Sequence, residues 1–206
     1  LNPQRVYAVR VNPATQASLN LVDGSANNMI LIQSRDYGLY TNQIQFTLET
    51  GTNFGKKATI SFQSDPATVI DDIRRQSFTI QYTGGAATMT IVNNSGAQTL
   101  TTSAGGLSIT LSDYNTVGEL VSYINSQTDF TCSVIAGQEN ASPLKLDAVS
   151  AVDINTSPYI AQSTFQAIID AINAGSARVS AEAANGANDR VIPENLAATF
   201  LTGGTE

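Results

Sequence analysis

The stretch RVYAVRVNPATQASLNLVDGSANNMILIQSRDYGLYTNQIQFTLETGTNFGKKATI, residues 5–60, decides the fold class. Short runs of alternating polar and apolar residues repeat along it, separated by turn-forming pairs such as Asn12-Pro13 and Asp23-Gly24. Successive side chains of a strand point to opposite faces, so a half-buried sheet requires this two-residue period. We therefore predict five consecutive strands, over Arg5–Val11, Gln16–Val22, Met29–Gln33, Gln43–Glu49 and Ala58–Phe62.

Outward from this stretch the strand pattern continues, interrupted by shorter helical patterns. Asp65-Pro66 predicts a short helix through about Gln76, because Pro suits the first turn, where its missing N–H costs nothing. Pro193–Phe200 is expected to form a final helical turn or two. Further strands or short extended pieces are expected over Ser77–Tyr82, Ala87–Val92, Gln98–Thr102, Ser108–Leu111, Phe130–Ile135, Leu144–Asp147, Ala151–Ile154 and Arg178–Ala181.

Two capping-box patterns mark the clearest helices. In the first, the Thr116 hydroxyl can accept from a first-turn N–H while Glu119 reaches back to the cap, and the helix should end near Ser126. The second begins at Ser163 with Gln166 three residues later, and Gly175 is expected just past its end in a left-handed conformation. The apolar stripes that these helices should bury consist of Leu120, Val121 and Ile124, and of Phe165, Ile168, Ile169 and Ile172.

This order of elements predicts an α+β fold. We expect predominantly antiparallel β structure, sandwich or barrel-like, with a small inserted strand-rich α+β module and two to four short helices. The predicted division is a β-rich domain over 1–76, a small α+β module over 77–136, and a loop and helical segment over 137–206 that packs back on the first domain.

Composition excludes several classes of function. Of the 206 residues only 13% are charged and the net charge is −7, which argues against a nucleic-acid groove lined by Lys and Arg. The longest strongly apolar run, Met29–Ile32, is too short to span a bilayer. A single cysteine excludes an internal disulfide. We therefore expect no nucleic-acid partner and no membrane partner.

Two candidates for catalysis have stronger structural interpretations. Cys132 could act as a nucleophile, but the chain contains no His to serve as its base, so a buried structural thiol is favoured. Asp71-Asp72 could form a metal or acid–base pair. In the predicted helix, however, Asp71 faces Arg74 and Arg75, which favours a solvated salt-bridged surface.

The remaining candidates also favour structural roles. Asp23, Asp36 and Asp113 adjoin turns, where Asp caps its own backbone. Gly84-Gly85 and Gly105-Gly106 lack the Walker pattern and are expected to be hairpin turns. Core or interface packing is favoured over a stacking platform for the aromatic set Tyr37, Tyr40, Phe78 and Tyr82. We accordingly predict no catalytic residue, no cofactor, no metal site and no enzyme.

Spaced patches of the chain resemble the contractile tail sheath proteins of bacteriophages (myoviruses). In that family a strand ending in Arg-Val leads to an Ala-Thr-x-Ala-Ser/Thr strand, as Val9-Arg10-Val11 leads to Ala14-Thr15-Gln16-Ala17-Ser18-Leu19 here. Thr41 stands where the second Gly of a following Gly-x-x-Gly-Asn turn is common, so that turn is expected to differ. The other similar patches are Asp23-Gly24, Met29–Gln33, Tyr37–Ile44, Thr116–Ser126 and Leu201–Thr205.

The resemblance implies a mechanical function in a viral tail. Sheath subunits polymerise around the tail tube and contract to drive it through the host cell envelope for genome ejection. The implied partners are neighbouring sheath subunits and the tail tube, and the implied location is the virion, with the host cytoplasm during assembly. We further expect this chain to be a protease-resistant fragment of a longer subunit that is monomeric in isolation.

Two alternatives stay open. The chain could come from the sheath of another contractile injection machine, such as a tailocin or a secretion system. It could also be a carbohydrate-binding or adhesin β-domain, because these share Ser/Thr/Asn-rich strands and low charge, although such domains usually show exposed aromatics, often Trp.

Overall fold

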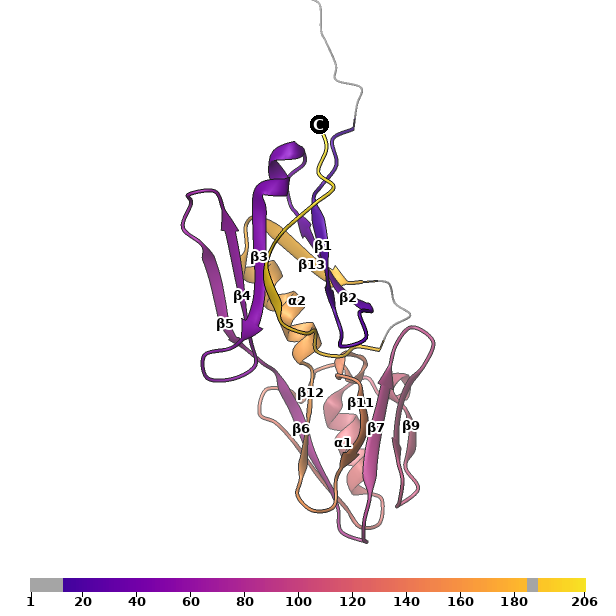
Figure 1. Cartoon of the computed structure of the whole chain (residues 1–206). Coiled ribbons are helices and arrows are strands. Elements are labelled where there is room, and N and C mark those ends of the chain that lie inside the picture. The colour runs from indigo at the N-terminus through magenta and orange to yellow at the C-terminus, as the bar shows by residue number, and fades with distance from the viewer. Residues whose placement is uncertain (1–12, 185–188) are drawn as a thin grey trace, which may run out of the picture.

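The computed structural model describes residues 13–184 and 189–206. Its described strands form four sheets in which every strand pair is antiparallel, accompanied by two α-helices and three short 3-10 helices (Figure 1). This confirms the predicted α+β fold with predominantly antiparallel β structure. The strand predicted over Arg5–Val11 lies outside the described residues.

One hydrophobic cluster, which we term the first body, includes Ile30, Phe46 and Ile168. Its helix α2 (Thr164–Gly175) buries the predicted stripe against strands β5 and β13. Its sheets are β1-β2-β13 and β14-β3-β4-β5, with bounds β1 Ser18–Val22, β2 Asn28–Ser34, β3 Ile44–Thr50, β4 Lys56–Phe62, β5 Thr68–Ile73, β13 Val179–Ala183 and β14 Leu196–Phe200.

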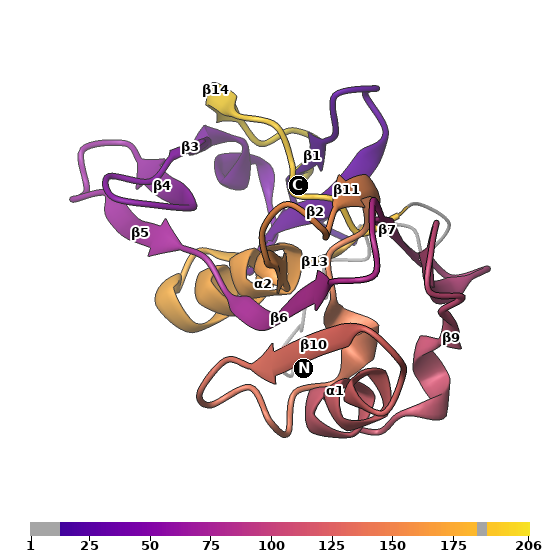
Figure 2. The same ribbon diagram turned by 90° about the horizontal axis from the view of Figure 1, so that it is seen from below.

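The C-terminal segment joins the two sheets of the first body. After β14 the chain crosses from β3 to β1: the Leu201 N–H donates to the Ile44 carbonyl at 2.9 Å, and the Ser18 N–H donates to the Thr202 carbonyl at 2.8 Å. Thr15 then bridges Thr205. The two sheets and α2 thus surround a single core, as the view from below shows (Figure 2).

A second hydrophobic cluster, the second body, includes Phe78, Met89 and Leu120. Helix α1 (Val117–Asn125) packs on β10 and buries Val117, Leu120, Val121 and Ile124. The sheets are β10-β6-β12 and β11-β7-β8-β9, with bounds β6 Gln76–Tyr82, β7 Thr88–Asn93, β8 Gln98–Thr102, β9 Ser108–Thr110, β10 Phe130–Val134, β11 Val149–Asp153 and β12 Tyr159–Gln162. The 3-10 helices are η1 Leu39–Gln43 in the first body, and η2 Leu111–Asp113 and η3 Pro143–Lys145 in the second.

The second body is inserted between β5 and α2 of the first. The two points where the chain passes between the bodies are adjacent, because the Ser163 N–H donates to the Arg75 carbonyl at 2.8 Å. The sequence pattern places a boundary after Ala136, whereas the second cluster continues through Leu146 and Ile154 to Ala161. The first cluster resumes at Phe165.

Two predicted helices are wrong. Residues 68–73 form strand β5, which pairs antiparallel with β4, instead of the helix expected from Asp65-Pro66. The β-branched residues Val69, Ile70 and Ile73 suit the strand, and β4 supplies a partner that the local pattern could not indicate. Likewise, Leu196–Phe200 forms strand β14 on β3 where a helical turn was expected.

The two capping boxes behave differently. Thr116 caps α1 as predicted, because its hydroxyl accepts from the Glu119 N–H at 3.1 Å. The Glu119 carboxylate reaches one residue further back than predicted and accepts from the Asn115 N–H at 2.8 Å. Ser163 is the N-cap residue of α2, but its side chain makes no capping hydrogen bond within the described residues. The second predicted capping box is therefore wrong. The first N–H groups of α2 donate to the carboxylate of Asp147 instead of to the Ser163 hydroxyl.

Gly175 has a role other than the one predicted. It is the last residue of α2, and its φ is not in the left-handed region. A Cβ added there would lie 2.7 Å from Cδ1 of Ile70 on β5. The missing side chain therefore allows close packing of α2 on β5.

Candidate functional site

Cys132 is a buried structural thiol, as predicted. It lies on β10 with 5% of its surface exposed, and burial raises the pKa of the thiol to about 12. The Asn125 side chain holds the backbone at this point, accepting from the Cys132 N–H and donating to its carbonyl, both at 2.7 Å. A protonated, buried thiol is a poor nucleophile.

Asp71 and Asp72 hold the β3–β4 loop onto β5. The Thr52 N–H donates to Asp71 at 3.0 Å, and the Asn53 N–H donates to Asp72 at 2.8 Å. Hydrogen bonds from the side chains and then the N–H groups of Thr52 and Asn53 lower the pKa of Asp71 and Asp72 respectively. Both carboxylates therefore stabilise a loop.

The ion pairs predicted for Asp71 are wrong, because β5 is extended and residues three or four apart do not share a helical face. Arg75 instead pairs with Asp170 of α2 at 2.9 Å. The Arg74 guanidinium lies 4.4 Å from the ring centroid of Phe54.

The remaining candidates are dispersed over both bodies. Asp23 caps its own turn as predicted, accepting from the Asn27 N–H at 2.8 Å, while Asp36 follows β2 and Asp113 ends η2. Gly105-Gly106 turns between the paired strands β8 and β9, as expected of a hairpin. The hairpin predicted at Gly84-Gly85 is wrong, because these residues join β6 and β7, which belong to different sheets.

The aromatic candidates do not form one platform. Phe78 is fully buried in the second body, and Tyr82 lies against Phe130 with ring centroids 4.8 Å apart. Tyr37 and Tyr40 lie in the first body, 59% and 43% exposed, and Tyr40 contacts the ring of Phe62 edge-on. The set therefore divides between core packing and an exposed surface.

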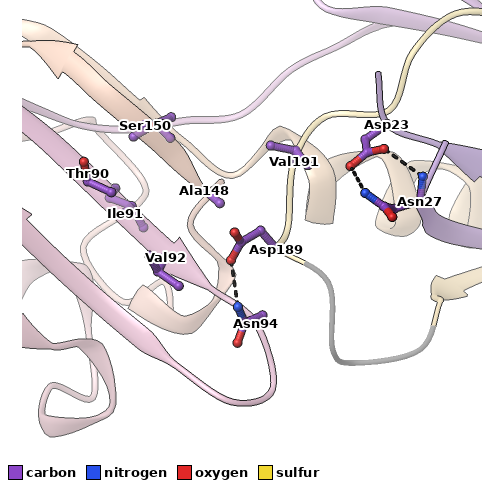
Figure 3. Close-up of a pocket in the computed structure, with 11 residues that line it drawn as sticks. Asp23, Asn27, Thr90, Ile91, Val92, Asn94, Ala148, Ser150, Asp189 and Val191 are labelled. Carbon is purple, nitrogen blue, oxygen red and sulfur yellow. Dashed lines mark hydrogen bonds between the residues drawn. The ribbon is translucent and has the colours of Figure 1, made fainter. Parts of the chain in front are cut away.

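A pocket of about 430 Å³ lies between the two bodies (Figure 3). The first body contributes Asp23 and Asn27, and β7 and β11 of the second form the opposite wall. Asp189 accepts from the Asn93 N–H at 3.2 Å and from the Asn94 amide at 3.0 Å. Asp23 and Asp189 both hold backbone or amide groups of this chain, and apolar side chains such as Ile91 and Val191 also line the pocket. The two carboxylates therefore stabilise the walls of a crevice of mixed character.

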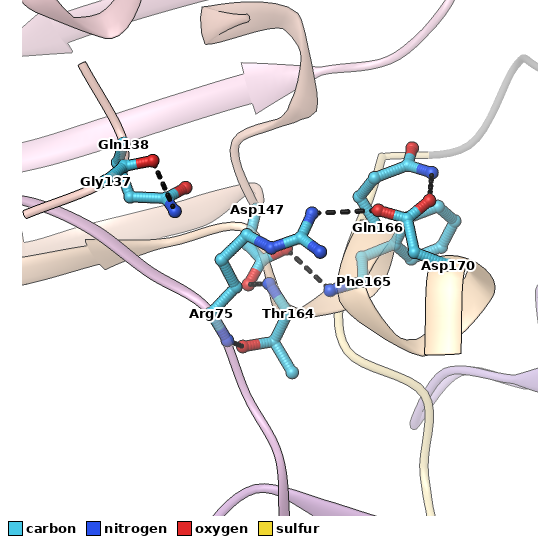
Figure 4. Close-up of polar contacts among 8 residues, drawn as sticks. All are labelled: Arg75, Gly137, Gln138, Asp147, Thr164, Phe165, Gln166 and Asp170. Carbon is cyan, nitrogen blue, oxygen red and sulfur yellow. Dashed lines mark hydrogen bonds and ion pairs between the residues drawn. The ribbon is translucent and has the colours of Figure 1, made fainter. Parts of the chain in front are cut away.

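A second polar cluster, the junction, lies where the chain passes between the bodies (Figure 4). Asp147 is 4% exposed, and its carboxylate accepts from the N–H groups of Thr164 and Phe165 at 2.8 and 2.9 Å. These N–H groups belong to the first turn of α2, so Asp147 caps this helix in place of Ser163. Sequence reasoning missed it because the cap lies 17 residues before the helix.

Burial dominates the electrostatics of Asp147. It raises the pKa of the carboxyl to about 6, and the two N–H donors oppose the rise only in part. The nearby guanidinium of Arg75 donates to Asp170 at 2.9 Å, and the Gln166 amide donates to the other oxygen of Asp170 at 2.9 Å. The junction thus contains one ion pair and one buried carboxylate held by backbone.

Over residues 13–184 and 189–206, no group of three or more Cys, Asp or Glu side chains is placed to hold a metal ion. No helix in the same ranges is long and apolar enough to cross a membrane. Comparison with known proteins adds no assignment, since no protein-family model matches the chain and no curated protein matches it.

Proposed function

We propose that this chain is a structural part of a contractile tail sheath subunit, which polymerises around a tail tube and contracts to drive the tube through a host cell envelope. The resemblance of its sequence patches to sheath proteins carries the proposal. The same mechanical role would serve in the sheath of another contractile injection machine.

The arrangement of the chain ends supports this role. Thr15 and Thr205 form a β-bridge, and the Thr15 hydroxyl donates to the Gly203 carbonyl at 2.6 Å. The described chain therefore begins and ends side by side on the first body. A two-body unit that is attached to the rest of a longer subunit at this one place can move as a whole. Contacts between subunits can then be exchanged while the unit keeps its own fold, as a contracting assembly requires.

The test is assembly. The longer sheath subunit that contains this chain should form tubular polymers visible by negative-stain electron microscopy, whereas the present chain should remain monomeric by light scattering. Filaments of the present chain alone, or a longer subunit that never polymerises, would contradict the proposal.

One observation favours a saccharide-binding module as the second candidate. Phe200 is 55% exposed and borders a groove of about 290 Å³ whose other lining residues are Gln43, Gln45, Ser61 and Gln63. An exposed ring beside amides and a hydroxyl can contact the apolar face and the hydroxyls of a sugar. Glycan-array binding that is lost in Phe200→Ala but retained in Phe54→Ala, another exposed aromatic, would favour this candidate over the sheath.

A further inference from the structure

We propose that residues 189–195, which we term the strap, fix the orientation of the second body on the first, so that the two bodies turn as one rigid unit. In sequence the strap lies between β13 and β14 of the first body, yet its first residues are hydrogen-bonded to the second body. The inference concerns the chain itself and holds whether or not the chain belongs to a sheath.

The second body holds the beginning of the strap. The Arg190 N–H donates to the Asn93 carbonyl at 3.0 Å, and the Ala148 N–H donates to the Arg190 carbonyl at 2.9 Å. Arg190 therefore lies between the last residue of β7 and the residue that precedes β11. The Asp189 carboxylate adds a side-chain contact, because it accepts from the Asn93 N–H at 3.2 Å and from the Asn94 amide at 3.0 Å (Figure 3).

The anchor on the second body is itself firmly held. Asn93 is fully buried, and its amide donates to the carbonyls of Leu144 and Leu146 at 2.9 and 2.7 Å. Leu146 is in turn a fully buried member of the second cluster. Displacement of Arg190 would leave the Asn93 carbonyl without this partner at a buried position, which is unfavourable.

The first body holds the rest of the strap. Val191 packs against the first hydrophobic cluster, and the Glu194 N–H donates to the Val22 carbonyl at the end of β1 at 2.8 Å. The Lys56 ammonium on β4 donates to the Asn195 side chain at 2.9 Å. The strap thus ends on two different sheets of the first body before it continues into β14.

The strap has little slack between its two anchors. Residues 191–193 alone separate Arg190 from Glu194, and an extended chain spans at most about 3.6 Å per residue. The ring of Pro193 fixes its own φ and disfavours a helical conformation at Ile192. The second body therefore cannot turn away from the first without breaking one of the anchors.

The strap and the two connections hold the second body at different sheets. Arg75 and Ser163 are hydrogen-bonded to each other beside β6 and β12, whereas Arg190 is bonded beside β7 and β11, in the other sheet (Figure 1). Rotation about the two connections would separate Arg190 from Asn93 and Ala148. Each attachment therefore blocks the rotation that the other would allow.

Residual dipolar couplings of the backbone amides test the proposal on the intact chain. In a weakly aligned sample a rigid unit has a single alignment tensor, so the couplings of both bodies should fit the same tensor. Arg190→Pro removes the N–H that donates to Asn93, and the common tensor should then be lost. Arg190→Ala is the matched control and should keep the common tensor, because both of these hydrogen bonds are made by the backbone of residue 190.

Two outcomes would overturn the proposal. They are couplings of the intact chain that require separate tensors for the two bodies, and a common tensor that survives in Arg190→Pro. If Arg190→Pro fails to fold, amide hydrogen exchange in the unmodified chain decides instead. Protection of the Arg190 and Ala148 amides within about tenfold of that of the core residue Ile80 supports the strap, and weaker protection refutes it.

Discussion

At Gly55 the backbone leaves no room for a side chain. Its φ is +63°, in the left-handed region, and an added Cβ would overlap the carbonyl oxygen of Ile73 on β5. Because the obstacle is backbone and the conformation is strained for other residues, we expect Gly55→Ala to lower the free energy of unfolding by about 1–3 kcal/mol.

Chemical denaturation measures this effect, and Gly96→Ala is the matched control. The nearest atom to a Cβ at Gly96 is Oδ1 of Asn94 at 3.5 Å, an ordinary contact. The control should therefore stay within about 0.5 kcal/mol of the parent. Equal losses in the two variants would contradict the close approach described at Gly55.

Asp72 provides a prediction of how the pH affects the β3–β4 loop. Hydrogen bonds from the side chain and then the backbone of Asn53 lower its pKa below 3.8, so their stabilisation is fully present above pH 3.8 and is lost as the pH falls through the folded pKa. The intrinsically corrected protection of the Asn53 amide should therefore fall on acidification below pH 3.8. A protection factor that is flat in this range, or unchanged by Asp72→Asn, would contradict this role.

At the scale of elements, the two capping-box sequences allow a direct comparison. Thr116→Ala should destabilise the second body by about 1 kcal/mol, because the hydroxyl accepts the Glu119 N–H at the start of α1. Ser163→Ala should cost less, since the N–H groups of Thr164 and Phe165 donate to Asp147. Thermal unfolding of both variants tests this order, and the reverse order would show that Ser163 contributes to capping.

The alternation of polar and apolar residues predicted most of the strands, because the side chains of a half-buried strand face the core and the solvent in turn. Ile44, Phe46 and Leu48 of β3 are all buried, as their spacing indicated. β5 and β14 were mistaken for helices because their stability comes from pairing with β4 and β3, which no local pattern records. The capping role of Asp147 could not be predicted for the same reason, because the helix that it caps begins 17 residues later in the sequence.

At the scale of the whole molecule, the adjacent connections predict that the first body can fold without the second. Residues 76–162 could be replaced by a short Gly-Ser linker, because Arg75 and Ser163 are already hydrogen-bonded and the first cluster contains no residue from that range. The shortened chain would lose the Asp147 cap, so it should unfold at a lower temperature than the parent.

Circular dichroism and a dispersed two-dimensional NMR spectrum would establish whether the shortened chain folds. The substitution Ser163→Asp in the shortened chain provides a new N-cap for α2, so it should recover part of the lost stability. A disordered spectrum for both variants would show that the first cluster depends on the inserted body.

The burial of Cys132 has a practical consequence for labelling the two bodies. It is the sole cysteine of the chain, and a thiol with a pKa of about 12 that is 5% exposed reacts slowly with maleimides. Cysteines introduced in pairs on the surfaces of the two bodies would therefore accept fluorophores without replacement of the native residue. Energy transfer between such dyes would report the distance between the two bodies in single molecules.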